Sequence, residues 1–268
     1  MENIENIILK PVGRVISSVE DPMEMPHGGL NAIVEVFPQY QDALLHIEKN
    51  SHIWVLAWFH KAPRNILRTR PFRVNQDLPE YGVFALRAFA RPNPIAMSLA
   101  KLNKIENNYL YVEGLDAVGG TPVLDIKPYF ERDTIFSPKT PYIKGSDREK
   151  REANLKKLAL AHHQEDCPQL TLAVKMASVA EDHFGLLNSN DLNVKVTGSP
   201  CLGDCIQGIS RARLSNPPRF TFIPSTEKSE TVWTRAEQVL TINLKGAYNE
   251  KEFSSLADEE LFFIKMIP

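Results

Sequence analysis

Short runs rich in β-branched and aromatic side chains, separated by turn residues, dominate the first 130 residues. This pattern favours strands and predicts extended segments at 7–17, 33–37, 52–59, 83–87, 95–105 and 109–112. Asn107 and Asn108 separate the last two segments, and both can adopt the left-handed backbone of a tight hairpin turn. Residues 40–49 carry apolar side chains at helical spacing and predict one short amphipathic helix. We expect a β-barrel or compact sheet.

The second half has a different pattern. A proline-marked stretch at 130–146 lacks periodicity, and we place a domain boundary in it, giving domains 1–143 and 144–268. Residues 148–162 and 168–184 each carry apolar residues on one face, which predicts two helices, the second with Pro168 in its first turn. Strand-like segments follow at 219–223 and 239–244, with a loop at Pro200 and a short acidic, amphipathic tail. The expected fold class is α+β.

Composition agrees with two ordinary globular domains. The 268 residues are 43% hydrophobic and 24% charged, and no apolar run is long enough to span a bilayer. The first residues lack the basic region and cleavage site of a secretory signal, and the three cysteines all lie in the second half. We therefore expect a cytoplasmic protein without a disulfide framework. The net charge of −2 creates no global field for a polyanionic partner.

One stretch is nevertheless strongly basic. Residues 61–76 contain five basic residues and no acidic one: Lys61, Arg64, Arg68, Arg70 and Arg73. Such a stretch is often only a solvated loop. Pro63, Pro71 and Phe72 would also suit a semi-rigid loop that presents guanidinium groups to phosphates and an aromatic ring to a base.

Two strings of residues have the composition of a ligand site. In Arg91-Pro92-Asn93-Pro94 the prolines fix the backbone, so the arginine and the amide point in set directions; the alternative is a corner between strands. In residues 116–129, Gly119 and Gly120 allow positive φ or close approach of a ligand. Asp125 and Lys127 follow on one strand, where they either meet a ligand or pair with each other. No G-x-G-x-x-G loop supports a Rossmann nucleotide site.

Together with Ser51-His52-Ile53-Trp54 and Gly82-Val83-Phe84-Ala85, these strings resemble the TrmO (TsaA-like, YaeB-like) tRNA methyltransferases over roughly residues 7–130. The resemblance implies a single-sheeted β-barrel, a homodimer, S-adenosylmethionine bound near the subunit interface, and methylation of the exocyclic nitrogen of N6-threonylcarbamoyladenosine at position 37 of tRNA. Methyl transfer from a sulfonium to an amine is an in-line displacement, so it requires no metal or covalent nucleophile.

The family's site residues transfer to this chain position by position. Arg91 and Asn93 are the candidate catalytic residues, and we expect alanine at either position to leave the fold intact. The candidate RNA-binding residues are Arg64, Arg68, Arg70 and Arg73. The candidate cofactor-binding residues are Pro26, His27, Gly28, His60, Lys61, Arg87, Met97, Gly119, Gly120, Thr121 and Pro122. We assign Trp54 and Trp58 to the core.

Two departures from the family pattern stand out: Ala96 replaces a glycine, and Gly119 replaces an acidic residue. The alternatives to an enzyme of this specificity are a non-catalytic sensor of S-adenosylmethionine or metal, and a methyltransferase for another acceptor.

The second half resembles the FmdE family over about residues 155–215. The resemblance implies a candidate zinc site formed by His163, Glu165, Cys167, Cys201 and Asp204, with Glu165 in place of a histidine. A degenerate module that keeps the fold without the metal is the alternative.

Overall fold

The computed structural model describes residues 7–136, 138–248 and 250–268. The chain forms two compact units: Met1–Arg70 with Pro79–Ile135, and Pro71–Leu78 with Phe136–Pro268. The backbone therefore passes from one unit to the other at three places. No helix in the described part of the chain has the length and hydrophobicity that a bilayer crossing needs.

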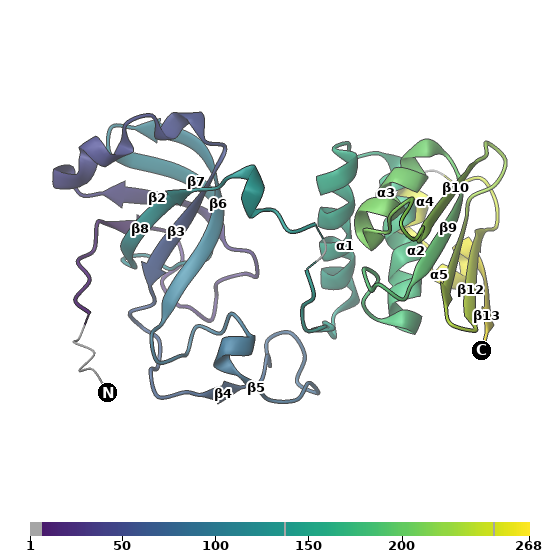
Figure 1. Ribbon diagram of the computed structural model, residues 1–268, viewed down its shortest axis with the longest axis horizontal. Helices are drawn as coiled ribbons and strands as arrows, with labels where there is room; N and C mark the ends of the chain where they lie inside the picture. The colour runs from purple at the N-terminus through teal and green to yellow at the C-terminus, as the bar shows by residue number, and fades with distance from the viewer. Residues whose placement is uncertain (1–6, 137, 249) are drawn as a thin grey trace. The chain divides into compact units, whose positions relative to one another are not determined.

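The first unit contains a closed barrel of six strands in the order β1-β2-β7-β6-β3-β8 (Figure 1). The strands are β1 (Gly13–Ile16), β2 (Leu30–Val36), β3 (His52–Trp58), β6 (Ile95–Glu106), β7 (Tyr109–Leu115) and β8 (Pro122–Pro128). All neighbouring strands are antiparallel. A small separate ribbon pairs β4 (Arg68–Thr69) with β5 (Tyr81–Gly82). The expected barrel and the α+β class are confirmed.

Strand periodicity decides which side chains fill the barrel. On β3, Ile53, Val55 and Ala57 are buried in the interior, because alternate residues point to the same side of the strand. Trp54 and Trp58 occupy the opposite phase and are only partly buried. Their assignment to the core was therefore wrong: both lie on the outside of the barrel, where Trp54 meets the ring of Tyr129 edge-on.

Local backbone structure agrees with the sequence at some turns and differs at others. The hairpin turn between β6 and β7 is confirmed, with Asn107 at φ 55°. Residues 40–49 form no amphipathic α-helix but two 3-10 helices, η1 (Pro38–Leu44) and η2 (Ile47–Lys49), without buried residues. Residues 83–87 are not a strand: Val83 is buried at the start of the 3-10 helix η3 (Val83–Ala85). A last 3-10 turn, η4 (Glu131–Asp133), follows β8.

The second unit packs three helices, α1 (Arg148–His163), α2 (Pro168–Phe184) and α3 (Pro200–Ser210), on one side of a five-stranded sheet (Figure 1). The sheet order is β10-β9-β11-β12-β13. Its strands are β9 (Asn193–Gly198), β10 (Phe220–Pro224), β11 (Glu230–Arg235), β12 (Gln238–Leu244) and β13 (Phe262–Ile267). Trp233, Leu240 and Ile242 are fully buried and belong to the same core as helix α2. Two short helices, α4 (Glu250–Ser255) and α5 (Asp258–Leu261), precede β13.

Four elements of this unit were not predicted from the sequence. Strands β9, β11 and β13 were not predicted, and the segment at Pro200 is a helix rather than a loop. The helix signal was present, since Ser199 caps the helix by accepting from the Leu202 amide and Pro200 occupies the first turn. Leu202, Ile206 and Ile209 then follow at helical spacing and are all buried.

Candidate functional site

The candidate residues of the first unit come from loops at one end of the barrel. Strand β3 ends at Trp58, which pairs with Ile95 at the start of β6. On the other side of β3, Ala57 pairs with Val123 near the start of β8. Leu30, at the start of β2, pairs with Leu115 at the end of β7. The loops that carry His60, Asn93, Gly119 and Pro26 therefore all leave the barrel at this end.

The turn from Gly119 to Pro122 lies against the end of β1 and the segment that follows it. The amides of Gly119 and Gly120 donate to the carbonyls of Val19 (2.8 Å) and Val15 (2.9 Å). Gly120 has φ +75°, which favours glycine, whereas a Cβ on Gly119 would meet at 2.5 Å only the movable end of the Glu20 side chain. Thr121 is fully buried, and its hydroxyl has no hydrogen-bond partner among the described residues.

The loop that contains Pro26, His27 and Gly28 closes through a hydrogen bond from the Gly29 amide to the Pro26 carbonyl, 3.1 Å. Gly28 and Gly29 have φ of 91° and 75°. A Cβ on Gly29 would lie 2.6 Å from the carbonyl oxygen of Leu115 and 2.7 Å from the nitrogen of Asp116. The loop thus lies against the end of β7, a few residues before the Gly119 turn.

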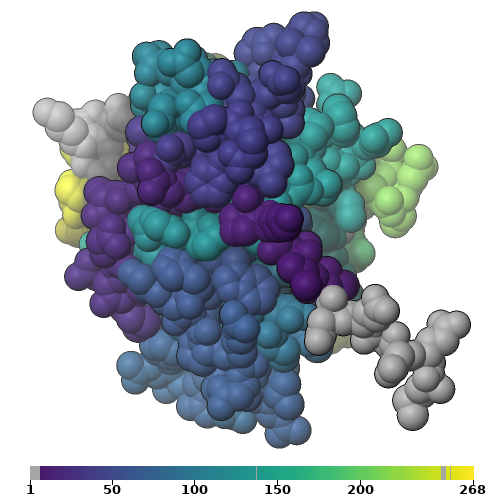
Figure 2. Space-filling view, turned by 90° about the vertical axis from the view of Figure 1, so that its left-hand side faces the viewer, coloured from purple at the N-terminus to yellow at the C-terminus, as the bar shows by residue number. Residues whose placement is uncertain are grey.

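Lys61 connects the end of β3 to the same region. Its ammonium donates to the carbonyl of Glu20 at 2.6 Å and lies 3.8 Å from the Glu20 carboxylate. Glu20 therefore contacts both the Lys61 side chain and the Gly119 turn. Figure 2, which faces this side of the first unit, shows the purple N-terminal segment adjoining the blue segment. No sequence motif marked Glu20, because its partners are 41 and 99 positions away in the chain.

Arg91 has a structural role that the sequence did not reveal. Its guanidinium donates to the backbone carbonyls of Ala88 (2.7 Å), Val83 (3.0 Å) and Leu86 (2.6 Å). These bonds hold the η3 segment in its bent course. The expectation that alanine at position 91 leaves the fold intact stays a prediction, but these three bonds give Arg91 a structural role beside its place in the motif. Asn93 differs, since its side chain is exposed.

The other candidates are exposed around this end. His60, Arg87 and Met97 are exposed, and Met97 lies on the outer face of β6 opposite Leu56. Asp125 and Lys127 form an ion pair of 2.7 Å, so they pair with each other, as the second of the two alternatives predicts.

The basic loop is divided between the two units. Arg64 lies over the ring of Trp58, 4.7 Å from its centroid, and Arg68 is exposed in β4. Arg70 is the last residue before the chain enters the second unit, which contains Arg73. The five basic residues therefore do not belong to one loop of the barrel unit, because Arg73 lies in the second unit.

In the second unit three of the five predicted metal ligands converge. The ligand atoms of His163, Cys167 and Cys201 all lie within 4.8 Å of one another, and His163 Nε2 is 3.4 Å from Cys167 Sγ. Cys167 occupies the N-cap position of α2 and Cys201 lies in the first turn of α3, so two helix N-termini with positive partial charge favour thiolates here. Opposing this, burial and the neighbouring Cys167 raise the pKa of the Cys201 thiol. A divalent cation would remove that conflict, because it stabilises thiolates.

Asp204 and Glu165 do not join this group. Asp204 binds the other side of the imidazole, with Oδ2 2.8 Å from His163 Nδ1 and Oδ1 3.1 Å from His162 Nε2. Glu165 is exposed. A carboxylate on the distal nitrogen fixes the tautomer and orients a metal-binding histidine. The contact of His162 with Asp204 was not predicted from the sequence. Cys205 on α3 is fully buried, and burial raises the pKa of its thiol to about 12.

Comparison with known proteins agrees with the motifs at the barrel end. The model of the tRNA-methyltransferase O N-terminal domain matches residues 17–133. A probable S-adenosyl-L-methionine-binding protein of Methanothermobacter thermautotrophicus is 42% identical over 129 residues, which are 47% of this chain and 91% of that protein. The chain belongs to the TrmO family.

Other TrmO relatives differ in how far they match. A probable S-adenosyl-L-methionine-binding protein of Archaeoglobus fulgidus is 32% identical over 219 residues, 78% of this chain, and the chain spans 59% of its length. A mouse protein named tRNA (adenine(37)-N6)-methyltransferase is 35% identical over 135 residues, 46% of this chain and 31% of that protein. A crystal structure of TrmO from Pseudomonas aeruginosa is 30% identical with a TM-score of 0.41, covering 53% of this chain and 63% of that one.

Proposed function

We propose that this TrmO-family chain is an S-adenosylmethionine-dependent tRNA methyltransferase that acts on the exocyclic nitrogen of adenosine 37, carried by a domain at 1–143. The convergence of the TrmO motif residues on one barrel end supports the proposal. The names of the mouse and archaeal relatives supply the acceptor and the methyl donor. We further propose N6-threonylcarbamoyladenosine as the acceptor nucleoside and the cytoplasm as the location.

Bound S-adenosylmethionine would supply an electrophilic methyl group: the exocyclic nitrogen would form the N–C bond as the S–C bond breaks, its proton would pass to water, and S-adenosylhomocysteine would leave. The chain must align the two molecules and exclude water. The buried Thr121 hydroxyl and the glycine-rich turns at 28–29 and 119–120 offer polar atoms at close range. They support the cofactor-binding assignment of Pro26, His27, Gly28, His60, Lys61, Arg87, Met97, Gly119, Gly120, Thr121 and Pro122.

Within the Arg91-Pro92-Asn93-Pro94 string the two polar residues take different roles. The exposed amide of Asn93 is the group that contacts the substrates, whereas Arg91 positions the loop through its three carbonyl partners. Arg64, Arg68, Arg70 and Arg73 bind the phosphates of the anticodon loop. That loop is single-stranded, so its base is accessible without melting a duplex.

The deciding experiment uses tRNA from cells that lack this methylation, labelled S-adenosylmethionine, and nucleoside digestion with mass spectrometry. We expect a methyl group on the modified adenosine at position 37, lost with Asn93→Ala and kept with Asn154→Ala, an exposed control on α1. Binding of S-adenosylmethionine without transfer to any tRNA would favour the sensor. Methyl transfer to a small molecule or a protein, and to no tRNA, would favour a methyltransferase for another acceptor.

A homodimer is also proposed, from an apolar surface on the outside of the barrel. Trp54, Leu56 and Trp58 on β3 pair with Leu99, Met97 and Ile95 on β6, so six apolar side chains share the outer face. Ile95, Met97 and Leu99 are 40%, 49% and 38% exposed. Contiguous exposed apolar surface typically marks an interface. Leu99→Lys should convert a dimer to a monomer in light scattering; a monomeric wild type contradicts the proposal.

For the second unit we propose an FmdE-like domain at 144–268 that binds zinc through His163, Cys167 and Cys201. Two thiolates and an imidazole are a set that zinc prefers, and Asp204 orients the imidazole. Stoichiometric zinc should copurify with the untagged chain and be lost in Cys167→Ser and Cys201→Ser. Metal-free wild type, with cysteine variants of unchanged stability, would identify a degenerate module.

A further inference from the structure

The segment Pro71–Leu78 belongs by its contacts to the second unit, although the chain on both sides of it belongs to the first. It is also the later part of the basic stretch and contains Arg73. The loop between β3 and β6 therefore leaves the barrel unit, is held elsewhere, and returns.

The contacts that hold this segment are made with residues 144–146. The carbonyl of Val74 accepts two hydrogen bonds from Ser146, one from its amide and one from its hydroxyl, both 3.2 Å. The amide group of the Asn75 side chain donates to the carbonyl of Lys144 at 3.2 Å. Its oxygen accepts from the Asp77 amide at 2.9 Å, so both ends of the Asn75 side chain are used.

The segment itself is a tight turn. The amides of Val74 and Asn75 donate to the carbonyl of Pro71 at 2.9 and 3.1 Å. Pro71 has a fixed φ, which reduces the number of conformations open to the turn. A turn of this kind presents its side chains in a set direction only while its outside contacts persist.

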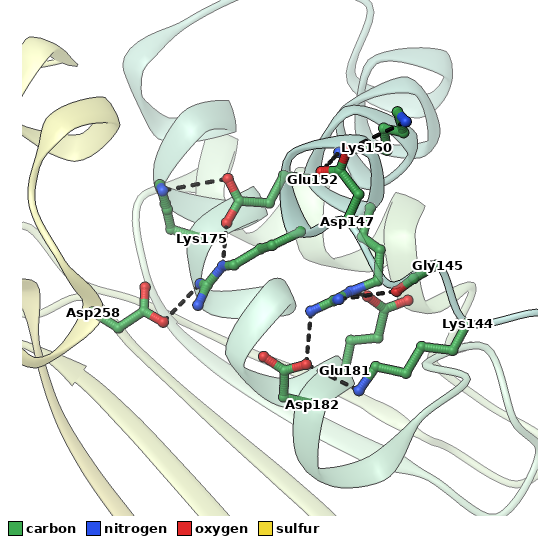
Figure 3. A network of polar contacts seen from close by, with 11 residues as sticks. Lys144, Gly145, Asp147, Lys150, Glu152, Lys175, Glu181, Asp182 and Asp258 are labelled. Carbon is green, nitrogen blue, oxygen red and sulfur yellow. Dashed lines mark hydrogen bonds and ion pairs between the residues drawn. The ribbon is translucent and has the colours of Figure 1, made fainter. Parts of the chain in front are cut away.

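Lys144 and Gly145 are fixed in turn on two helices (Figure 3). Arg151 of α1 donates to the carbonyl of Gly145 at 3.1 Å and binds Glu181 (3.1 Å) and Asp182 (2.8 Å) of α2. Lys144 reaches the same Asp182 carboxylate at 3.0 Å. The Arg151 side chain is only 11% exposed, so this network is better shielded from solvent than a surface ion pair. Nearby, burial raises the pKa of the Tyr142 phenol.

A continuous path of bonds therefore joins α1 and α2 to residues 144–146 and from there to Val74 and Asn75. We propose that residues 144–146 of the second unit set the conformation of the turn 71–78, which carries Arg73, with Asn75 and Ser146 as positioning residues for tRNA binding. This rests on the proposed function for its RNA partner. Arg73 lies within the held turn, whereas Arg68 is held in the first unit by the pairing of β4 with β5. A preformed loop binds more tightly, because less conformational entropy is lost on association.

The test uses three variants. The first is a double variant that combines Asn75→Ala and Ser146→Ala. The second, Ser146→Thr, keeps the hydroxyl, and the third, Asn154→Ala, is an exposed control. Hydrogen exchange should accelerate at residues 71–78 and at the Ser146 amide in the double variant alone. The double variant loses the side-chain hydrogen bonds from Asn75 to Lys144 and from Ser146 to Val74. The Kd for tRNA should rise by at least roughly three- to tenfold, the net contribution of one such bond. Affinity for S-adenosylmethionine and kcat at saturating tRNA should not change.

Unchanged exchange in the double variant would overturn the proposal, as would faster exchange with unchanged tRNA affinity. The outcome is separable from the proposed function. If the wild type neither binds nor methylates tRNA, the proposed function and the RNA role of the turn fall together. Hydrogen exchange then still decides whether the second unit holds this segment.

Discussion

Replacing Arg91 with alanine should loosen the segment from Val83 to Ala88 before it changes any chemistry. The side chain is partly buried and donates to three backbone carbonyls within this segment. A hydrogen bond from a charged group contributes a net of about 1.5–3 kcal/mol, and carbonyls that regain water recover part of it. We therefore expect local opening to become easier by about 2–4 kcal/mol.

Hydrogen exchange measures this effect at particular amides. Val83 donates to the Leu67 carbonyl at 3.0 Å and Arg91 to the Pro63 carbonyl at 3.2 Å, so both amides report on the loop. Their exchange should accelerate roughly 30- to 1000-fold in Arg91→Ala, because each 1.36 kcal/mol is a factor of ten. Arg91→Lys should lie between, because one ammonium cannot reproduce the planar fork of a guanidinium.

Arg87 supplies the matched control, since it is an exposed arginine four positions away. Arg87→Ala should leave the exchange of both amides unchanged. If Arg91→Ala also leaves them unchanged while methyl transfer is lost, Arg91 acts on the substrates and its positioning role is refuted.

Three further predictions follow from the geometry. Gly29→Ala should lower the free energy of unfolding of the barrel by at least about 2 kcal/mol, because a Cβ meets the Leu115 backbone at positive φ. Gly82→Ala, in open space, is its control, and equal Tm values in thermal unfolding would contradict the prediction. Changing Arg68, Arg70 and Arg73 to Gln should reduce the slope of log K against log salt for tRNA by roughly 2. Lys157→Gln on α1 should not, and an unchanged slope would leave the basic loop merely solvated. Asp204→Asn should weaken zinc binding roughly 10- to 100-fold in a chelator competition. Asp166→Asn, in an exposed pair with Lys156, should not, and equal affinities would remove the orienting role of Asp204.

Local physical chemistry made much of this protein readable from its sequence. β-Branched runs marked most barrel strands, and Asn107 and Gly120 marked positions where the backbone adopts positive φ. The helices at 148–162 and 168–184 were predicted nearly to the residue. These features depend on neighbours within a few positions, which the sequence displays directly.

The tertiary structure decided the rest, because the interactions concerned join distant residues. Trp54 and Trp58 lie on the outside of the barrel, because the pairing of β3 with its neighbours turns Ile53, Val55 and Ala57 inward. Arg91 binds carbonyls that only a folded loop brings to it. Asp204 contacts His163 from a helix that was predicted as a loop, so it lies on the imidazole rather than among the three converging ligand atoms. Residue type alone could not show these roles, because strand phase, loop course and helix packing are properties of the whole chain.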